Sequence, residues 1–302
     1  MAIWKKYIYP STIAEAIGVL TCPAGSTRII AGGTDLLMDL QQGRTPPVDC
    51  LLDVTRIKEL TVLEQRGNEI FVGAALPLRE IFSSPLLLQQ AQALVEACNL
   101  IGGPQVRNTA TLGGNVAHAL PAADGAIALL ALDAQAEVAS GRGIRRMPLI
   151  DLYEWPGKNT LKPDEILVGF YISKSSSGQS SAFSRIMRPQ GVALPIINMA
   201  AWLERDGRQA LKIRISVGPA GLIPQRAILA EQVLMGKEIE SETIQAACSA
   251  LHEQIHFRTS PRRATSQYRD DLSEVLLKEV LTKVWNRADS QTGVFNGGGF
   301  YG

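Results

Sequence analysis

Hydrophobic spacing divides the first 55 residues into short strands and helices. Thr12, followed by Glu15, forms a capping box at the start of a helical pattern. Two brief apolar runs have the length of strands, and a second helical pattern lies between them. The predicted elements are helices over residues 13–20 and 35–42 and strands over residues 28–30 and 50–54.

The pattern changes at about residue 56. The turn Arg66-Gly67-Asn68 joins two strands over residues 61–73, which is typical of a hairpin. Pro77 and Pro85 each open a helix, and the second of these runs to about residue 98. A glycine-rich stretch with little helical periodicity follows. The remaining predicted elements are a helix near residues 125–132 and strands over residues 134–139 and 166–172.

A polar, serine-rich linker over residues 173–180 precedes a third region. There three strands are followed by three helices, an order that is typical of an α+β domain. The strands are expected over residues 182–187, 196–203 and 211–217, and the helices over residues 226–234, 241–254 and 264–285. The glycine-rich tail, residues 288–302, has no packing pattern, and we expect it to be mobile or to become ordered against a partner.

Composition excludes several classes of protein. Of the 302 residues, 46% are hydrophobic, which is enough for a folded core. The 30 Lys and Arg residues nearly balance the 29 Asp and Glu residues, so the net charge of +1 provides no overall attraction to nucleic acid. Apolar stretches are far shorter than the ~20 residues of a membrane-spanning helix, and we expect neither a transmembrane segment nor a signal peptide. The 4 cysteines form no CxxC pair, which indicates buried thiols in the reducing cytoplasm.

Positive charge gathers locally in the third region, at Arg258, Arg262, Arg263 and Arg269. No aromatic residues alternate with these arginines, and no helix-turn-helix signature accompanies them. We therefore expect a solvated face or a contact with a partner subunit, and no binding of nucleic acid.

The first candidate site is the segment Arg28-Ile29-Ile30-Ala31-Gly32-Gly33-Thr34-Asp35, in which a strand runs into two glycines. Glycines allow successive backbone N–H groups to converge on an anion and allow a phosphate to approach without meeting a Cβ atom. The helix start that follows adds free donors and the positive end of its dipole. A single glycine pair is equally compatible with an ordinary strand–turn–helix connection.

The segment Thr109-Ala110-Thr111-Leu112-Gly113-Gly114-Asn115 contains a second glycine pair. Two such turns could hold both phosphates of a dinucleotide, with side-chain donors from Thr111 and Asn115 and with Asp124 as an acceptor for a ribose hydroxyl. No GxGxxG follows a strand and no GK[ST] occurs, which argues against a nicotinamide-type nucleotide fold and a Walker loop. Spacing alone leaves a pyrophosphate site and two simple turns as open alternatives.

The paired segments AGGTDLL and GGPQVRNTATLGGNVAHALPAAD resemble the FAD-binding medium subunits of molybdenum hydroxylases, the family of xanthine dehydrogenase and carbon monoxide dehydrogenase medium chains. Three later segments carry the likeness to about residue 285: PGKNTLKPDEILVGFYI, VGPAGLIPQRAILAEQVLMG and SPRRATSQYRDDLSEVLLKEVL. The resemblance implies an α+β fold. A two-part FAD-binding domain of the vanillyl-alcohol-oxidase type would span residues 1–55 and 56–175. A C-terminal domain of the CO dehydrogenase flavoprotein type, with a three-stranded antiparallel sheet and helices, would span residues 181–287.

The resemblance also implies roles for individual residues. Arg28 to Asp35 would wrap the FAD pyrophosphate, and Asp124 would lie on its ribose and adenine side. The second phosphate loop would consist of Ala110, Thr111, Gly113, Gly114 and Asn115. Ile101 and Leu167 fall where the family places apolar contacts with the cofactor. Many relatives carry a flavin-proximal lysine after the strand around Phe183, where this chain has Ser184-Arg185, so Arg185 is the candidate replacement.

By the same resemblance, the chain is an oxidoreductase subunit in a heterotrimer or a dimer of heterotrimers. A large partner with a molybdopterin cofactor would oxidise the substrate, and a small partner with [2Fe-2S] clusters would pass electrons to the FAD of this chain. The external acceptor would be NAD, a quinone or oxygen. Since no triad, carboxylate pair or metal cluster is present in the sequence, we assign no catalytic residue and no metal ligand.

Two alternatives remain. His252, Glu253 and His256 match the HExxH pattern of zinc hydrolases, but the pattern ends a predicted helix and no later histidine follows. A self-sufficient FAD-dependent oxidase or reductase would need its own catalytic base, and the C-terminal region offers no obvious one. His118, the only histidine near the glycine pairs, is interpreted as structural.

Overall fold

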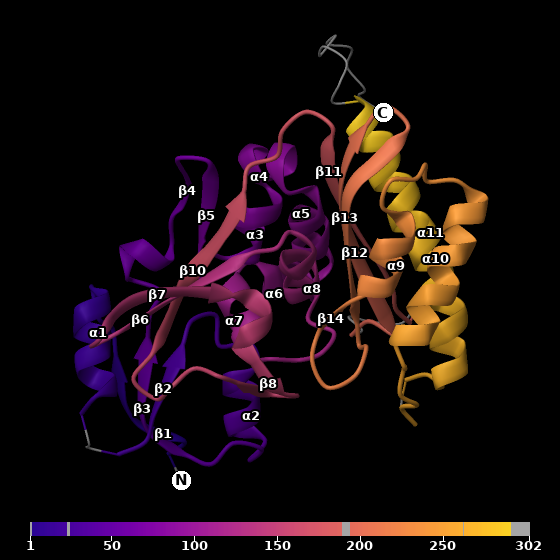
Figure 1. Cartoon of the computed structure of the whole chain (residues 1–302). Helices are drawn as coiled ribbons and strands as arrows, with labels where there is room; N and C mark the ends of the chain where they lie inside the picture. Colours follow the sequence, from indigo (N-terminus) through magenta and orange to yellow (C-terminus); the bar gives the residue numbers. More distant parts are fainter. Residues whose placement is uncertain (1, 23–24, 189–193, 262, 291–302) are drawn as a thin grey trace.

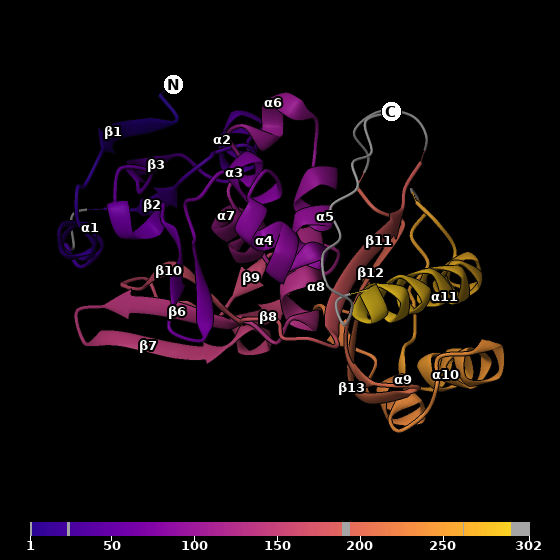
Figure 2. The ribbon, with the colours of Figure 1, turned by 90° about the horizontal axis from the view of Figure 1, so that it is seen from above.

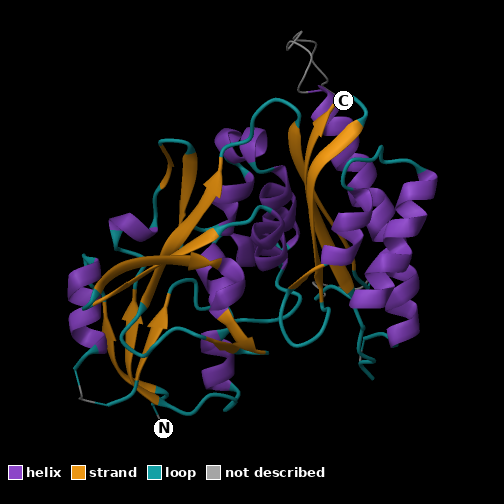
Figure 3. Cartoon of the chain, in the orientation of Figure 1, coloured by secondary structure: helices purple, strands orange, loops and turns teal. Residues whose placement is uncertain are grey.

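Within the described residues, three larger β-sheets, each with its own helices, and one small two-stranded sheet form the fold, and this arrangement confirms the α+β class (Figures 1 and 3). The computed structural model describes residues 2–22, 25–188, 194–261 and 263–290. No helix within these ranges is both long and apolar enough to cross a membrane.

The first sheet is three-stranded and parallel, in the order β1-β3-β2. Its central strand is apolar on both faces, and Leu51 and Leu52 are fully buried there. The hydroxyl of Thr12 accepts the N–H of Glu15 at 3.1 Å, as the capping pattern predicts. The elements are β1 (Trp4–Ile8), α1 (Ile13–Leu20), β2 (Thr27–Ile30), α2 (Leu36–Gln41) and β3 (Val48–Asp53).

The second sheet is five-stranded and antiparallel, in the order β4-β5-β10-β6-β7. Its strands are β4 (Leu63–Arg66), β5 (Glu69–Gly73), β6 (Gln135–Ser140), β7 (Gly143–Pro148) and β10 (Ile166–Ser173). Its helices are α3 (Leu78–Phe82), α4 (Pro85–Gln90), α5 (Gln92–Leu100), α6 (Pro104–Arg107), α7 (Leu112–Ala117) and α8 (Asp124–Ala131). A small hairpin, β8 (Tyr153–Trp155) and β9 (Lys158–Asn159), precedes β10.

The third sheet is four-stranded and antiparallel, in the order β11-β12-β13-β14. Its elements are β11 (Gln179–Ile186), β12 (Ile197–Asp206), β13 (Gln209–Gly218), β14 (Gln225–Arg226), α9 (Ile228–Leu234), α10 (Ser241–Gln254) and α11 (Ser266–Ser290). The sheet lies between two layers of helices, with α5 and α8 on one side and α9–α11 on the other (Figure 2).

Strand β12 shows why this sheet joins the domains. Ala200 and Trp202 belong to the core that contains α5 and α8, whereas Met199, Ala201 and Leu203 belong to the core beneath α9–α11. Side chains alternate between the two faces of a strand, so both parities are apolar when both faces are covered. The sequence of β12 is therefore a nearly continuous run of hydrophobic residues.

Glu96 of α5 covers the free edge of β11 with a polar contact. Its carboxylate accepts the N–H of Phe183 at 2.7 Å and pairs with Arg287 of α11. Arg287 also donates to the carbonyl oxygen of Ser181 at 2.8 Å. These bonds satisfy the unpaired backbone groups of an edge strand and connect the helices on both sides of the sheet.

Several sequence predictions need correction. The helix expected from Pro85 to residue 98 is two helices, because Ala91 leaves the helical conformation and Ser175 donates to the carbonyl oxygen of Gln90 at 2.7 Å. The glycine-rich stretch contains the short helices α6 and α7, and strands β7, β8 and β9 were not expected. The third sheet has a fourth, two-residue strand, β14, in addition to the three predicted. Helix α11 continues to Ser290, past the predicted start of the tail at residue 288, and residues 291–302 lie outside the described residues.

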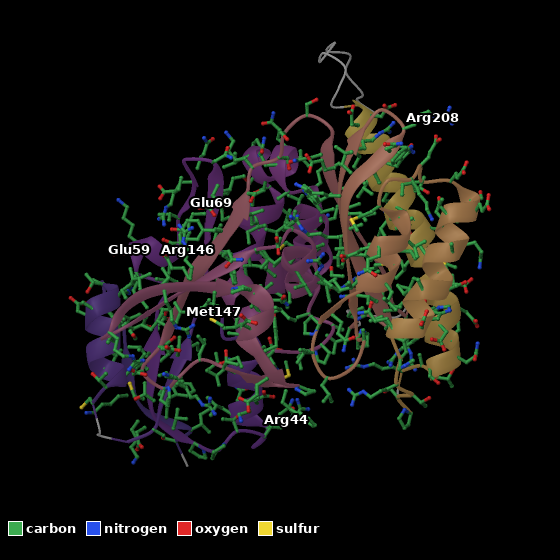
Figure 4. All side chains as sticks on the ribbon, viewed as in Figure 1. Arg44, Glu59, Glu69, Arg146, Met147 and Arg208 are labelled. Carbon is green, nitrogen blue, oxygen red and sulfur yellow. The ribbon has the colours of Figure 1, made fainter. Side chains whose placement is uncertain are left out.

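Replacing Glu96 by alanine tests the edge contact. Glu96→Ala removes the acceptor of the Phe183 N–H and one of the partners of Arg287, and we expect the free energy of unfolding to fall by about 1–3 kcal/mol in denaturant titrations. Glu59→Ala, which removes an exposed carboxylate labelled in Figure 4, is the control and is expected to change stability by less than about 0.5 kcal/mol. Equal effects from the two variants would contradict a stabilising role for the Glu96 contact.

Candidate functional site

A cavity of about 1330 Å³ lies where the three parts of the chain meet. This volume exceeds the ~300–1,000 Å³ of a typical small-ligand pocket, so it has room for an elongated ligand. All predicted site residues line it: Arg28, Ile29, Ile30, Ala31, Gly32, Gly33, Thr34, Asp35, Ile101, Ala110, Thr111, Gly113, Gly114, Asn115, Asp124, Leu167 and Arg185. Whether each of them contacts a cofactor stays a prediction.

The first glycine loop connects β2 to α2. Gly33 has a φ of +67°, a conformation that side chains with a Cβ rarely adopt. Within the described part of the chain, the backbone N–H groups of Gly32, Gly33, Thr34 and Asp35 donate to no other residue. Four neighbouring free donors on a cavity wall are typical of an anion site.

The second glycine loop is organised differently. The hydroxyl of Thr111 caps α7 by accepting the N–H of Gly114 at 3.1 Å, and the N–H of Gly113 donates to the carbonyl oxygen of Ala74 at 2.8 Å. The side-chain oxygen of Asn115 accepts the N–H of Gly125 at 3.0 Å. The glycine N–H groups that we expected to face a phosphate are therefore engaged within the protein. What this loop can offer a ligand is the Thr111 hydroxyl proton and the Asn115 amide group.

The two loops lie in direct contact. A Cβ atom on Gly32 would overlap the carbonyl oxygen of Thr109 and would come within 2.7 Å of the Cα atom of Ala110. His118, at the end of α7, has its Nδ1 atom 3.8 Å from a carboxylate oxygen of Asp35. The neighbouring Asp35 carboxylate raises the pKa of His118, and the same contact lowers the pKa of Asp35. Residues that are about 80 positions apart in the sequence thus form one wall, as expected for a site built from two loops.

Arg107 is a residue that the sequence analysis did not single out. Its guanidinium donates to the carbonyl oxygens of Ile101 and Gly102, at 3.3 and 2.7 Å. These bonds hold the turn at Gly102, where φ is +56°, and so position Ile101 on the cavity wall. The only signal in the sequence was the position of Arg107 inside the glycine-rich segment.

Asp124 and Arg185, which we predicted to contact the cofactor separately, form one ion pair. Arg185 donates to Oδ2 of Asp124 at 2.6 Å, and Asn198 of β12 donates to Oδ1 at 2.6 Å. Both charged side chains are about 5% exposed, and burial raises the pKa of Asp124. Because both carboxylate oxygens already accept strong hydrogen bonds, the pair orients the cavity wall, and Asp124 is less free to bind a ribose than the sequence indicated.

The HExxH residues do not form a metal site. Helix α10 ends at Gln254, so His256 lies beyond the helix and not one turn along its face. The Nε2 atom of His252 is 3.0 Å from the hydroxyl of Ser273. No group of three or more His, Cys, Asp or Glu side chains within the described ranges could hold a metal ion.

Comparison with known proteins extends the resemblance to nearly the whole chain. Residues 3–174 match the family model described as "FAD binding domain in molybdopterin dehydrogenase", and residues 181–284 match the "CO dehydrogenase flavoprotein C-terminal domain". The chain is 30% identical to the nicotinate dehydrogenase FAD-subunit of Eubacterium barkeri, over 90% of this chain and 94% of that subunit. It is 29% identical to the xanthine dehydrogenase FAD-binding subunit of Escherichia coli O157:H7, over 93% of this chain and 96% of that subunit.

A solved structure agrees with this result. A chain of carbon monoxide dehydrogenase from Hydrogenophaga pseudoflava superposes with a TM-score of 0.88 at 26% sequence identity, and the match covers 94% of this chain and 98% of that one.

The contact between His118 and Asp35 predicts a pH dependence in the ligand-free chain. A histidine whose pKa is raised above 6.5 contributes stability that is complete below that pH and is lost as the pH rises through the raised pKa. Because the pKa of Asp35 is lowered, the stability that depends on the charged Asp35 carboxylate is lost only below pH 3.8. We expect the melting-temperature difference between the native chain and Asp35→Asn to be larger at about pH 5.5 than at about pH 8.5.

Asp206→Asn, at the exposed end of β12, is the matched control and should show no such difference. An NMR titration should give His118 a pKa above 6.5 that falls in Asp35→Asn. An unchanged His118 pKa in that variant would contradict the pairing.

Proposed function

Because this chain belongs to the family of FAD-binding subunits of molybdenum hydroxylases, we propose that it carries electrons, through a bound FAD, from the [2Fe-2S] clusters of a partner subunit to an external acceptor. The observation that supports this proposal best is the contact between the two glycine loops on the wall of a dinucleotide-sized cavity. The chain itself is an oxidoreductase subunit.

The residues present fit FAD. The free N–H groups from Gly32 to Asp35 are suited to a pyrophosphate, since these four neighbouring residues line the cavity and their N–H groups have no partner within the described residues. Arg28 lies exposed on the same wall and adds a positive charge. Ile101 and Leu167 supply apolar surface for an aromatic ring system.

The bound flavin supplies the ability to take up electrons singly and to release them as a pair. The chain's own residues bind and orient that group. The first loop holds the phosphates, the Thr111 hydroxyl and the Asn115 amide assist from the second loop, and the Asp124–Arg185 pair fixes the wall nearest the C-terminal domain. None of these steps requires a general acid or base from this chain.

The partners in this proposal are a small iron–sulfur subunit and a large molybdopterin subunit, joined as a heterotrimer or a dimer of heterotrimers. The names of relatives such as the nicotine 6-hydroxylase medium subunit support a multi-subunit assembly. We propose the cytoplasm as the compartment, because the cysteines at positions 22, 50, 98 and 248 are all unpaired.

A methyl group added at Gly32 tests FAD binding. Gly32→Ala would push the first loop away from Thr109 and Ala110, and we expect FAD affinity to fall about tenfold or more, measured as flavin absorbance per chain after gel filtration. Gly18→Ala, in α1 with no neighbour within 4 Å of the added carbon, should retain FAD fully. Native FAD content in Gly32→Ala would argue against the loop assignment.

Purification from the native cells tests the electron-transfer role. A tagged chain is expected to co-purify with two further subunits and with iron and molybdenum, measured by elemental mass spectrometry alongside the flavin spectrum. A chain that purifies alone with FAD and oxidises an organic substrate without iron or molybdenum would support a self-sufficient oxidase and refute the proposal.

A further inference from the structure

His118 lies on the cavity wall beside the first glycine loop, at the end of α7. Its Nδ1 atom is 3.8 Å from a carboxylate oxygen of Asp35, and the two side chains are 31% and 64% exposed. The sequence indicated a structural histidine, whereas the ion-pair contact of this side chain is with a residue of the predicted phosphate loop. The contact thus gives His118 a place in the site itself.

Asp35 combines two opposite properties. Its backbone N–H is one of the four free donors of the first loop, but its side chain brings a negative charge to the same wall. The residue precedes the first turn of α2, and its carboxylate caps none of the N–H groups of that helix. A carboxylate next to a phosphate weakens phosphate binding because like charges repel each other. The loop therefore holds a pyrophosphate most tightly when this carboxylate is neutralised.

His118 is the group in contact with Asp35 that can neutralise it. Among the described residues, no lysine or arginine lies within ion-pair distance of Asp35, and exposed Arg28 adds its charge elsewhere on the same wall. Strand β10, which packs against α7, contains no charged residue. The other charged groups around the histidine form pairs of their own: Asp39 of α2 with Arg44, Asp124 of α8 with Arg185, and Glu154 of the β8–β9 hairpin with Lys158.

The charge of this pair changes near neutral pH. The Asp35 carboxylate raises the pKa of His118 above 6.5, burial opposes this rise, and the charge of Asp39 adds to it. Below the raised pKa the pair is neutral overall, and above it the pair carries one negative charge beside the four N–H donors. The pyrophosphate of FAD keeps its charge across this range, so any change in affinity comes from the protein.

We propose that His118 is a further residue of the FAD phosphate site, where its protonated imidazole neutralises Asp35 and makes binding of the cofactor dependent on pH. This inference rests on the proposed function and adds a residue, and a control by pH, to that same site. FAD binds most tightly while His118 is protonated, and its affinity falls as the pH rises and the proton is lost. Because the binding of the proton and of the cofactor are linked, bound FAD in turn favours the protonated histidine.

Calorimetric titration of the flavin-free full chain with FAD, and separately with inorganic pyrophosphate, tests this role. We expect the native chain to bind both probes about 3- to 10-fold more weakly at about pH 8.5 than at about pH 5.5. Asp35→Asn keeps the backbone N–H and removes the charge, so its affinity should be the same at both pH values. His118→Gln cannot gain a proton and should bind at both pH values as weakly as the native chain does at the higher one.

The double variant Asp35→Asn/His118→Gln separates neutralisation from structural support. If His118 acts by neutralising Asp35, removal of the carboxylate restores tight binding to the His118→Gln chain. A double variant that binds as weakly as His118→Gln alone would mean that the histidine only supports the loop, and this would overturn the inference. His256→Gln, which changes an exposed histidine outside the cavity lining, is the control and should keep the native pH dependence.

An NMR titration of His118 in the native chain needs no variant to fold. Its pKa is expected to be higher in the FAD-loaded chain than in the flavin-free chain. Equal pKa values in the two states, or a native FAD affinity that does not change with pH, would overturn the inference and leave the proposed function intact. Failure of the native chain to bind FAD at either pH would instead refute the proposed function, and the inference with it.

Discussion

The close approach of two backbones at Gly32 is the constraint on which the site depends. The loop after β2 can lie against Thr109 and Ala110 only because position 32 has no Cβ atom. This contact joins the parallel sheet to the antiparallel one and brings His118 next to Asp35. Gly32 to Asp35 line the cavity, and their N–H groups have no partner in the described chain. A larger residue at this one position would separate the two walls of the site.

The third sheet closes the cavity from the other side. Its strand β12 packs into two cores at once: one face is buried against α5 and α8, and the other face is buried beneath α9–α11, so the strand joins the C-terminal domain to the FAD-binding part. Asn198 of β12 and Arg185 of β11 then reach Asp124 at the start of α8. The C-terminal domain also contributes Arg258, Arg263 and Arg269 to the cavity wall. All three parts of the chain thus line the site. The first contributes free backbone N–H groups, the second contributes the Thr111 and Asn115 side chains and Asp124, and the third contributes Arg185.

Helix caps and hydrophobic spacing predicted helices and strands well where interactions between residues close in the sequence determine the structure. Helix α10 has the predicted bounds, Ser241–Gln254, because its polar start and its apolar spacing agree. The prediction failed at Ala91, next to the Gln90 carbonyl oxygen that accepts a hydrogen bond from the distant Ser175 hydroxyl. It also failed at β14, a two-residue strand that is too short to show a hydrophobic pattern. These elements depend on partners far away in the chain, and spacing contains no information about such partners.

The sequence by itself determined the fold class and the two glycine loops, and its resemblance to a family identified the cavity residues, because turn chemistry and periodicity are local properties. Only the tertiary structure decided what each of these residues does. It showed that the glycine N–H groups of the second loop form hydrogen bonds within the protein and that Asp124 and Arg185 form an ion pair. It also showed that Arg269 is buried with no carboxylate of the described chain as its ion-pair partner. Hydrogen-bond donors and charges act through the partners that folding brings within about 3–4 Å, and those partners lie tens of residues away in the sequence.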